Sequence, residues 1–460
     1  MDNRYDIIVI GSGPGGYVAA IRAAQCGKRV AIVEKADAGG VCLNWGCIPT
    51  KALVRSAQVY ADCKAAATYG VNIEGEVKPD WAKMVERERT VATTMNKGVQ
   101  FLLKKNNIDV IAGFGRLKAQ DIVEVEGVEY EADYVILATG ARPRVMPFMP
   151  VDGKHIISSK EALVLPELPE SMVVVGSGAI GSEFAYIYAT LGVKVTIIEY
   201  MPQIMPLEDE DTAKAMERAF RKLRATVMTS TTVKQVTVRE DGKCIIDIEG
   251  KKGEQTLEAD IVLSAVGIKS NIEDMGLEEL GIAIERDKVK VDEHYKTTVD
   301  GVYAIGDIIA TPALAHVASA EAIHCVEHIC GLEPEAIDYS TIPSCIFTSP
   351  EVASVGMTEA QVKAQGIEYK VGKFPYTASG KATAAGERDG FVKLLFDADE
   401  KLLGAHFVGH NVTEMIGEPT LAKVLGVNAH RIARTIHAHP SMHEAVMEAA
   451  EDALGCSIHV

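Results

Sequence analysis

The sequence predicts an α/β fold with two Rossmann-like units, and three observations support this prediction. A glycine-rich turn stands between an apolar β-run and a helix-like stretch close to the N-terminus. The same arrangement returns near residue 172, and in both places an acidic residue follows the first glycine by 23 residues. Two cysteines five positions apart come shortly after the first unit, so a nucleotide fold and a pair of thiols stand side by side in the chain.

The first unit begins with the apolar run Tyr5–Ile10 and the turn Gly11-x-Gly13-x-x-Gly16. These glycines allow a tight turn, the close approach of a pyrophosphate and the packing of helix on strand. A second β-run ends in Glu34, whose carboxylate can accept hydrogen bonds from a ribose. A glycine string alone is weak evidence. The strand before it, the helix after it and the acid at the end together indicate a dinucleotide site.

The second unit repeats each of these features. The run Met172–Val175 leads into Gly176-x-Gly178-x-x-Gly181, and a further β-run ends in Glu199. One ligand needs only one such fold, so the repeat predicts a second dinucleotide site. The alternative is a decayed repeat kept for packing, and the retention of all three glycines and the acid argues against it.

The residues after Glu199 indicate which nicotinamide dinucleotide to expect. Tyr200, Met201 and Pro202 follow, and no arginine stands nearby to bind a 2′-phosphate. The second site therefore predicts NAD and not NADP.

The cysteine pair, Cys42 and Cys47, lies just after the first unit. On a regular α-helix such residues have Cα atoms about 8–9 Å apart, which is beyond the roughly 7 Å limit for an unstrained disulfide. If the pair closes, the segment is not a regular helix, and we expect Gly46 to supply the irregular backbone. Pro49 suits the first position of the helix that follows, which places Cys47 at a helix N-terminus, where thiolate is favoured. Two structural cysteines that never bond are the alternative.

A dithiol beside two dinucleotide units has a simple chemical explanation. Nicotinamide passes hydride, thiols pass two electrons through sulfur, and a flavin can couple the two. The residues therefore predict a flavin disulfide reductase that uses FAD and NAD.

Two strand-turn patterns and one linker organise other parts of the chain. The run Tyr134–Pro143 predicts a strand ending in a turn, and Leu165–Pro169 predicts a linker before the second unit. The run Gly301–Asp307 predicts another strand and turn. Its Asp307 could hydrogen-bond a flavin ribityl or a phosphate-bound water, although aspartate after glycine is commonly a simple turn residue.

Composition and charge limit the function classes. With 460 residues and 47% apolar residues, the chain can form several domains with buried cores. A net charge of −17 argues against nucleic acid or an anionic membrane as the main partner. No apolar run has membrane-spanning length and no secretory signal opens the chain, so we expect a cytoplasmic protein, or one already trimmed of a targeting peptide. No metal site is expected.

Nine cysteines without framework spacing suit a reducing compartment in which only Cys42 and Cys47 cycle. The other seven are interpreted as structural or incidental: Cys26, Cys63, Cys244, Cys325, Cys330, Cys345 and Cys456.

Near the C-terminus, His439 precedes a proline, and Ser441-x-x-Glu444 has the form of a capping box that opens a helix. This gives Glu444 a structural explanation. In the functional explanation, Glu444 binds one nitrogen of His439, fixes its tautomer and raises its basicity, so that the other nitrogen can take a thiol proton. The neighbouring His437 and His443 are expected to be bystanders.

With these residues assembled, the sequence resembles the dihydrolipoyl dehydrogenase family of flavin disulfide reductases. The resemblance runs from about Tyr5 to the C-terminus. Its most specific elements are Gly-Gly-Val-Cys42-Leu-Asn-Trp-Gly-Cys47-Ile-Pro-Thr-Lys51, the Ala-Thr139-Gly140 turn, Ile180-Gly181-Ser182-Glu183, Ala-Ile-Gly306-Asp307 with Leu314-Ala315-His316, and His439-Pro440-x-x-x-Glu444.

The resemblance implies a role for each matching residue. Cys42 would exchange disulfide with the lipoyl group, Cys47 would lie against the flavin, and Lys51 paired with Glu183 would sit near the flavin's reactive edge. The residues implied to hold FAD are Gly11, Gly13, Gly16, Glu34, Lys51, Gly115, Thr139, Gly140, Asp307 and Ala315. Those implied to hold NAD are Gly176, Gly178, Ile180, Gly181, Glu199 and Gly267.

The family also implies an architecture and partners. A homodimer is expected in which His439 and Glu444 complete the partner's active site, through a C-terminal α+β dimerisation domain. The lipoyl domains of an acyltransferase, or the carrier protein of the glycine cleavage system, would be the substrates. The implied domains are residues 1–145 for FAD, 146–268 for NAD, 269–338 as a central domain completing the FAD site, and 339–460 as the interface.

Two departures from the family pattern affect connecting turns. The run Val266–Asn271 lacks the proline often found before that asparagine, and Thr348–Glu351 carries serine where histidine is frequent.

Two alternative functions remain open at this point. Another flavin disulfide reductase is one alternative, but a glutathione reductase should show arginines around the second nucleotide site. A mercuric reductase should end in vicinal cysteines, whereas this tail has only Cys456. A noncatalytic assembly subunit on the same scaffold is the other alternative, and the presence of both thiols, His439 and Glu444 argues against it.

Overall fold

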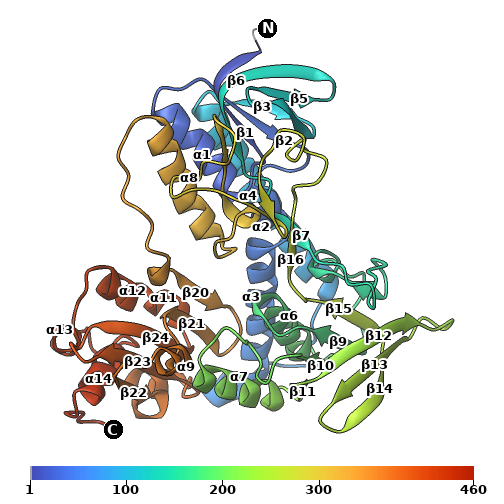
Figure 1. The fold of residues 1–460 in the computed structure, drawn as a ribbon. Coiled ribbons are helices and arrows are strands. Elements are labelled where there is room, and N and C mark those ends of the chain that lie inside the picture. The colour runs from blue at the N-terminus through green and yellow to red at the C-terminus, as the bar shows by residue number, and fades with distance from the viewer. Residues whose placement is uncertain (1–2) are drawn as a thin grey trace. The chain divides into compact units, whose positions relative to one another are not determined.

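A computed structural model describes residues 3–460 and confirms the α/β class, with two Rossmann-like regions and a C-terminal α+β region (Figure 1). The chain forms two compact units. The first consists of the described residues up to Leu53 with Ala82–Arg144 and Gly267–Ile337, and the second of Val54–Trp81, Val145–Val266 and Asp338–Val460. The four-domain division expected from the sequence stays a prediction.

The first unit is built on a seven-stranded sheet in which β3, β2, β1, β6 and β19 run parallel. The central run Ile7–Val9 is buried without exposed surface, as expected for a strand covered on both faces. An antiparallel meander of β4 and β5 extends from β6. The strands are β1 (Arg4–Ile10), β2 (Val30–Glu34), β3 (Asp109–Ala112), β4 (Gly115–Ala119), β5 (Ile122–Val125), β6 (Val128–Leu137) and β19 (Val302–Ala304), with the short pairs β7 (Ala141–Pro143) with β16 (Ile268–Ser270) and β17 (Ile284–Glu285) with β18 (Lys288–Val289).

Two helices of this unit, α1 (Pro14–Gln25) and α8 (Ala315–Ile329), lie side by side (Figure 1). Small residues on α1, among them Ala19 and Ala23, share one core with Ala322 and Val326 of α8. Their small size lets the two backbones approach closely. The remaining helical elements of this unit are α2 (Gly40–Asn44), α4 (Trp81–Lys105) and η2 (Gly306–Ile308). The helix α3 (Cys47–Ala65) begins in this unit and continues after Leu53 into the second, to which η1 (Ala66–Tyr69) belongs.

The second unit repeats the plan with a five-stranded parallel sheet in the order β11-β10-β9-β15-β8. An antiparallel sheet of β12, β13 and β14 takes the place of the meander. These elements are β8 (Ile156–Ile157), α5 (Ser159–Ala162), β9 (Ser171–Val175), α6 (Ala179–Thr190), β10 (Lys194–Ile198), α7 (Glu210–Lys222), β11 (Thr226–Met228), β12 (Thr232–Val238), β13 (Cys244–Gly250), β14 (Gly253–Ala259) and β15 (Ile261–Ser264).

The C-terminal region of this unit is a five-stranded antiparallel sheet in the order β20-β21-β24-β23-β22, with α14 packed on β22 and β23. The contact is close, because a Cβ on Gly372 would lie 1.8 Å from the carbonyl oxygen of Ala449. The elements are η3 (Tyr339–Thr341), β20 (Pro343–Ile346), β21 (Glu351–Gly356), α9 (Glu359–Ala364), β22 (Tyr369–Pro375), η4 (Tyr376–Ala378), α10 (Gly380–Ala385), β23 (Phe391–Asp397), β24 (Leu402–Gly409), α11 (Val412–Met415), α12 (Gly417–Val424), α13 (Ala429–Ala433) and α14 (Glu444–Ala453).

A buried charge cluster joins the start of α7 to this region. Lys393 has only 2% of its side chain exposed, and its Nζ lies 2.8 Å from Asp209 Oδ1, 3.2 Å from Asp211 Oδ2 and 2.6 Å from Glu359 Oε2. Burial opposes the charge on Lys393, but the hydrogen bonds to Asp209 and Glu359 outweigh it and hold the pKa of Lys393 above its usual range. Three carboxylates around one ammonium satisfy a charge that would otherwise be too costly to bury.

Over residues 3–460, the structure contains no helix that is both long enough and apolar enough to cross a membrane.

Candidate active site

The first glycine turn can be built only with glycine at two of its three positions. Gly11 has a φ of +100°, and a Cβ there would lie 2.3 Å from the carbonyl oxygen of Ala138. A Cβ on Gly16 would lie 1.8 Å from the carbonyl oxygen of Gly11. Gly13, in contrast, faces open space and precedes the first turn of α1. The space at Gly13 is what the approach of a pyrophosphate requires.

The acid at the end of β2 is held by a serine that the sequence reading missed. Glu34 Oε2 accepts hydrogen bonds from the backbone N–H of Ser12, at 2.9 Å, and from its hydroxyl, at 2.6 Å. Its Oε1 accepts a third bond from the N–H of Ala36 at 2.9 Å. The carboxylate is thus oriented at the carboxyl end of the sheet. The sequence does contain a sign of this role, because a serine stands between the first two glycines of both repeats.

The second glycine turn has nearly the same geometry. A Cβ on Gly176, whose φ is +96°, would lie 2.4 Å from Ala265 O, and one on Gly181 would lie 2.0 Å from Gly176 O. Glu199 Oε2 accepts from the N–H and hydroxyl of Ser177 at 2.9 and 2.6 Å, and Glu199 is buried. Two sites built alike argue against a decayed repeat.

The other residues expected at the second site can be placed one by one. Gly178 faces open space at the start of α6, and Ile180 is 42% exposed in the first turn of that helix. Gly267 follows β15 with a φ of +109° and has no neighbour within contact distance of a Cβ. Their roles toward NAD stay predictions.

The two cysteines lie on consecutive helices with a break between them. Cys42 belongs to α2, and Cys47 is the first residue of α3, so the predicted position at a helix N-terminus is present. The Cys42 thiol is hydrogen-bonded to Cys47, and this bond together with burial raises the pKa of Cys42. Cys47 is the more exposed of the two.

Gly46 lies in the break between α2 and α3, where irregular backbone was expected, and Trp45 before it has φ −143° and ψ 18°. Gly46 also supplies space, since a Cβ there would lie 3.1 Å from the carbonyl oxygen of Val41. One local expectation was wrong, because the helix starts two residues before Pro49. Proline is tolerated anywhere in a first turn, where the N–H groups have no partner inside the helix.

Contacts from distant parts of the first unit fix the break between α2 and α3. The side-chain amide of Asn44 donates to the carbonyl oxygens of Ala38 and Gly40, both at 2.9 Å. The guanidinium of Arg89 lies 4.1 Å from the centre of the Trp45 ring and donates to the Asn44 carbonyl at 2.8 Å. These side chains hold the thiols in place, and nothing in the local sequence pointed to Arg89.

The turn after β6 is hydrogen-bonded to Asn271, which ends the run Val266–Asn271 that lacks the family's usual proline. The Thr139 hydroxyl donates to the carbonyl oxygen of Asn271 at 2.6 Å, and the Asn271 amide donates back to Thr139 O at 3.0 Å. The N–H of Asn271 also donates to Gly140 O at 2.9 Å. Asn271 thus fixes this turn without a preceding proline. Gly115, also expected near FAD, begins β4 and packs on Ile10 and Val33.

Asp307 lies in the 3₁₀ turn η2, and burial raises the pKa of its side chain. The preceding Gly306, with φ +70°, donates its N–H at 2.7 Å to Glu321, a fully buried carboxylate on α8 that the sequence reading missed. Ala315 is the first residue of α8. The turn and the helix start are therefore tied together.

The two charged residues expected near the flavin edge lie on different helices. Lys51 lies in α3, one turn after Cys47. Glu183 lies in α6 and is buried, and its Oε1 accepts from the N–H of Phe347 at 3.0 Å. The pairing of Lys51 with Glu183 stays a prediction.

The expected hydrogen bond between His439 and Glu444 is present, with 2.8 Å between His439 Nδ1 and Glu444 Oε1. A carboxylate can only accept here, so Nδ1 carries a proton, and in the neutral ring Nε2 carries the lone pair. Partial burial opposes ionisation of Glu444, but hydrogen bonds from Ser441 and His439 hold its pKa below the usual range. The His439 side chain is 79% exposed, so its Nε2 side is accessible on this chain.

The capping box is only half formed, which corrects the sequence expectation. Glu444 Oε2 accepts from the Ser441 N–H at 2.8 Å, but the Ser441 hydroxyl is buried without a partner and α14 starts at Glu444 itself. Glu444 thus makes one contact with each oxygen, to Ser441 and to His439, and its role in catalysis stays a prediction. The neighbouring histidines His437 and His443 both bind Glu418, at 2.7 and 2.8 Å.

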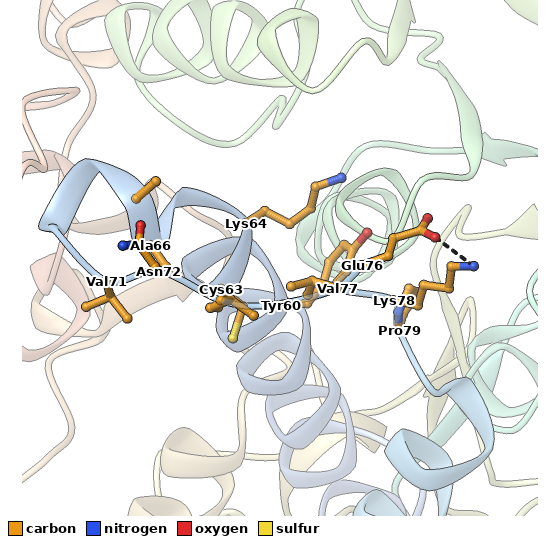
Figure 2. A pocket seen from close by; sticks show the side chains of 12 residues that line it. Tyr60, Cys63, Lys64, Ala66, Val71, Asn72, Glu76, Val77, Lys78 and Pro79 are labelled. Carbon is orange, nitrogen blue, oxygen red and sulfur yellow. Dashed lines mark ion pairs between the residues drawn. The ribbon is translucent and has the colours of Figure 1, made fainter.

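A separate hollow of about 520 Å³ lies along the end of α3 and the segment that follows it (Figure 2). Tyr60, Cys63 and Lys64 line it, and Glu76 and Lys78 form an ion pair at its rim, 2.9 Å apart. It contains none of the expected site residues. Within residues 3–460 no group of three or more His, Cys, Asp or Glu side chains is arranged to hold a metal ion.

Comparisons with known proteins agree with this geometry. Residues 5–322 match the family model described as pyridine nucleotide-disulphide oxidoreductase, and residues 342–450 match the dimerisation domain of the same family. A dihydrolipoyl dehydrogenase of Chlorobaculum parvum is 47% identical over 98% of this chain and 97% of its own. That of Bacillus subtilis is 44% identical over the full length of both chains.

Two solved structures share the fold. LpdA from Mycobacterium tuberculosis superposes with a TM-score of 0.90 at 28% identity, over 97% of this chain and 99% of its own. The flavoprotein disulfide reductase RclA from Escherichia coli gives a TM-score of 0.87 at 26% identity, with the same coverage. With two nucleotide turns, a paired dithiol and full-length relatives at this identity, the chain belongs to the dihydrolipoyl dehydrogenases of the pyridine nucleotide-disulphide oxidoreductase family.

Proposed function

We propose that this protein oxidises protein-bound dihydrolipoyl groups to the disulfide, with NAD⁺ as the final acceptor. The observation that carries the proposal is the hydrogen-bonded pair Cys42 and Cys47 at the start of α3. In this position the helix dipole stabilises the Cys47 thiolate. A pair of thiols held beside a dinucleotide turn suits disulfide exchange followed by electron transfer.

The residues of both turns fit the cofactors that the family uses, FAD and NAD(H). Open space at Gly13 and Gly178 leaves room for a pyrophosphate, and the anchored carboxylates of Glu34 and Glu199 can accept from a ribose. FAD would be held further by Gly11, Gly16, Lys51, Gly115, Thr139, Gly140, Asp307 and Ala315, and NAD by Gly176, Ile180, Gly181 and Gly267. Bound flavin would pass the two electrons from the thiols to the nicotinamide.

The thiols carry the first half of the reaction. A dihydrolipoyl thiolate attacks the sulfur of Cys42 in the oxidised pair, so the Cys42–Cys47 bond breaks and a mixed disulfide forms. The second lipoyl thiol then attacks its own partner sulfur and releases Cys42. The lipoyl group has lost two electrons and two protons, and the enzyme now holds the dithiol.

A base must take a proton from the lipoyl thiol in this step. We assign it to His439, whose Nε2 carries the lone pair while Glu444 binds Nδ1 at 2.8 Å. The ionised Glu444 stabilises the imidazolium that forms. Following the family expectation, His439 of the partner subunit serves each Cys42, so the active form is a homodimer. The match to a dimerisation domain supports this assignment.

We further propose the lipoyl domains of a 2-oxo acid dehydrogenase complex or of the glycine cleavage system as the physiological substrates, in the cytoplasm. The names of the relatives support the lipoyl chemistry, and nine cysteines without framework spacing suit a reducing compartment.

One assay tests the activity. The purified protein should carry yellow flavin, reduce NAD⁺ with dihydrolipoamide, and develop a long-wavelength band when dihydrolipoamide is added alone. Turnover of oxidised glutathione or Hg²⁺ without dihydrolipoamide activity would favour another disulfide reductase. Bound flavin with no turnover of any of these would favour the noncatalytic subunit.

A second experiment tests the shared site. Chains carrying Cys42→Ser and chains carrying His439→Ala, each inactive alone, should rebuild one intact site in every mixed dimer. Random mixing makes half the dimers mixed, so activity should approach roughly a quarter of the wild-type value. Tagged pull-down must first show that mixed dimers form. Mixed dimers without turnover would mean that His439 acts in its own chain or is not the base.

A further inference from the structure

A second pair of thiols lies in the first unit, outside the candidate active site. The side chain of Cys330 is hydrogen-bonded to that of Cys26. Both residues are half-buried free thiols, and both pack against the same hydrophobic core. They are 304 positions apart in the chain, so the fold alone brings them together.

The ends of α1 and α8 hold the two cysteines in place. Each cysteine is the C-terminal capping residue of its helix and is followed by a glycine in the left-handed region, Gly27 at φ +81° and Gly331 at φ +75°. The N–H of Cys26 donates to Arg22 O at 3.0 Å, and that of Cys330 donates to Val326 O at 2.9 Å. Neither thiol therefore lies on a loose loop.

An ion pair fixes the two helices one turn before the thiols. Arg22 Nε donates to Glu327 Oε1 at 3.0 Å, and the guanidinium of Arg22 acts electrostatically on both thiols. Lys28 adds a second positive charge near Cys330. Positive charges beside a thiol pair favour thiolate and hence disulfide exchange.

We propose that Cys26 and Cys330 form a second, reversible dithiol–disulfide couple that ties the end of α1 to the end of α8 under peroxide stress. This assigns a modification site to two cysteines that the sequence alone presents as incidental. The couple is separate from the Cys42–Cys47 pair, since it involves other residues and needs neither flavin nor nicotinamide.

The chemistry balances with hydrogen peroxide as the oxidant. Burial and the hydrogen bond to Cys26 raise the pKa of Cys330 and disfavour its thiolate, so the attack is assigned to Cys26. The Cys26 thiolate attacks one peroxide oxygen, the O–O bond breaks, and sulfenic acid and hydroxide form. Cys330 then attacks the Cys26 sulfur, the S–S bond forms and water leaves. Two thiols and one peroxide give one disulfide and two waters, and a small dithiol reverses the step.

The test uses the full-length holoenzyme and mass spectrometry. Reduced protein is treated with hydrogen peroxide, its free thiols are alkylated, and it is cleaved after Lys, Arg and Glu without reduction. Residues 23–28 and 328–335 are then separate peptides, since the bond between Glu333 and Pro334 resists cleavage, and Cys325 lies outside both. We expect one linked species that is two hydrogens lighter than the two peptides together and that disappears after reduction with dithiothreitol.

Matched variants define the site. The linked species should be lost in Cys26→Ser and in Cys330→Ser but kept in Cys63→Ser, which removes another half-buried thiol. It should also persist in the double variant Cys42→Ser/Cys47→Ser, because the catalytic pair is not the oxidant. If a serine variant fails to fold, the presence or absence of the linked species in the wild-type protein still decides the question.

Two outcomes would overturn the proposal. One is recovery of Cys26 and Cys330 as separately alkylated peptides after the peroxide has been consumed. The other is a link that forms only in protein unfolded in guanidinium, which would show that the native helices do not allow it. Oxidation should also raise the thermal midpoint of wild type by about 5 °C but not that of Cys26→Ser; an unchanged midpoint in linked protein would contradict the tie between the helices.

Discussion

The two glycine-turn repeats hold their carboxylates alike but lead into different segments. In the first, the N–H of Gly39 donates to Ser12 O at 3.0 Å, and the chain then enters the helix that carries Cys42. In the second, Met205 N donates to Ser177 O at 3.1 Å, and the chain continues to the start of α7. The same backbone anchor thus begins the segment that carries the thiols in one repeat and a loop without cysteine in the other.

The difference shows which part of the motif is scaffold and which part is chemistry. The glycines, the serine and the acid form a unit that orients one carboxylate wherever it occurs. The residues after the acid decide what the unit does. In the first repeat they bring two thiols to the turn, and in the second they bring Tyr200, which is 72% exposed, and Leu207, which is 90% exposed.

The largest effect is expected where the repeats differ most, at the thiols. Cys42→Ser and Cys47→Ser should each lower dihydrolipoamide turnover by more than about 10³-fold, because no other group can exchange disulfide there. The two variants should differ in their spectra. Cys42→Ser should keep the thiolate-flavin band and Cys47→Ser should lose it, since Cys47 is assigned to the flavin side. Identical spectra would refute this polarity.

In each repeat the third glycine of the turn packs against the backbone, so a substitution there should disrupt the shared scaffold. Gly16→Ala and Gly181→Ala should each cost about 3 kcal/mol, because the added Cβ meets a carbonyl oxygen at 1.8 or 2.0 Å. Thermal midpoints, with flavin content, measure the loss.

Gly13→Ala and Gly178→Ala are the matched controls. Gly13 has a φ of −62° and Gly178 a φ of −64°, and both glycines have open space around them. These variants should keep the wild-type midpoint within a few degrees but bind FAD or NAD more weakly. Equal destabilisation by all four substitutions would show that the loss of stability does not come from the contact between the added Cβ and the backbone.

Cofactor choice tests the second repeat alone. Glu199→Arg should replace an acceptor for the ribose diol with a cation for a 2′-phosphate, and should shift the NADP-to-NAD ratio of kcat/KM by about 10- to 100-fold. Steady-state kinetics with both nucleotides measure this ratio. Wild-type protein that already uses NADPH as well as NADH would remove the basis of the inference.

The smallest effect is expected at the serines that both repeats share. Ser12→Ala and Ser177→Ala each remove one hydroxyl bond of 2.6 Å to the carboxylate and leave the N–H bond in place. A loss of about 1 kcal/mol, or roughly five-fold, is expected in nucleotide affinity. In Ser177→Ala it should appear in the KM for NAD with kcat unchanged, and in Ser12→Ala in flavin affinity. A fall in kcat for Ser177→Ala would contradict a purely orienting role.

The sequence allowed prediction of what depends on neighbours in the chain. Both glycine turns, the strands around them and the helix start at Cys47 follow from local patterns, because left-handed or crowded positions accept little besides glycine. The hydrogen bond from His439 to Glu444 spans only five residues and was expected for the same reason.

What could not be predicted depends on contacts far apart in the chain. Arg89 stacks on Trp45, Glu321 binds Gly306, and the thiol of Cys330 meets that of Cys26. No local spacing marks any of these partners.

The charge cluster around Lys393 has a consequence for recombining this chain with its relatives. Asp209 caps α7 through the N–H of Asp211 and also accepts from the N–H of Glu359 at 3.0 Å, while Lys393 reaches all three acids. A chimera that exchanges only the C-terminal region would keep Lys393 with Glu359 but would take the residues at positions 209 and 211 from the other parent. The charges at these four positions therefore have to be exchanged together. A crossover near residue 340 preserves the fold only when both parents carry the same charges at all four positions.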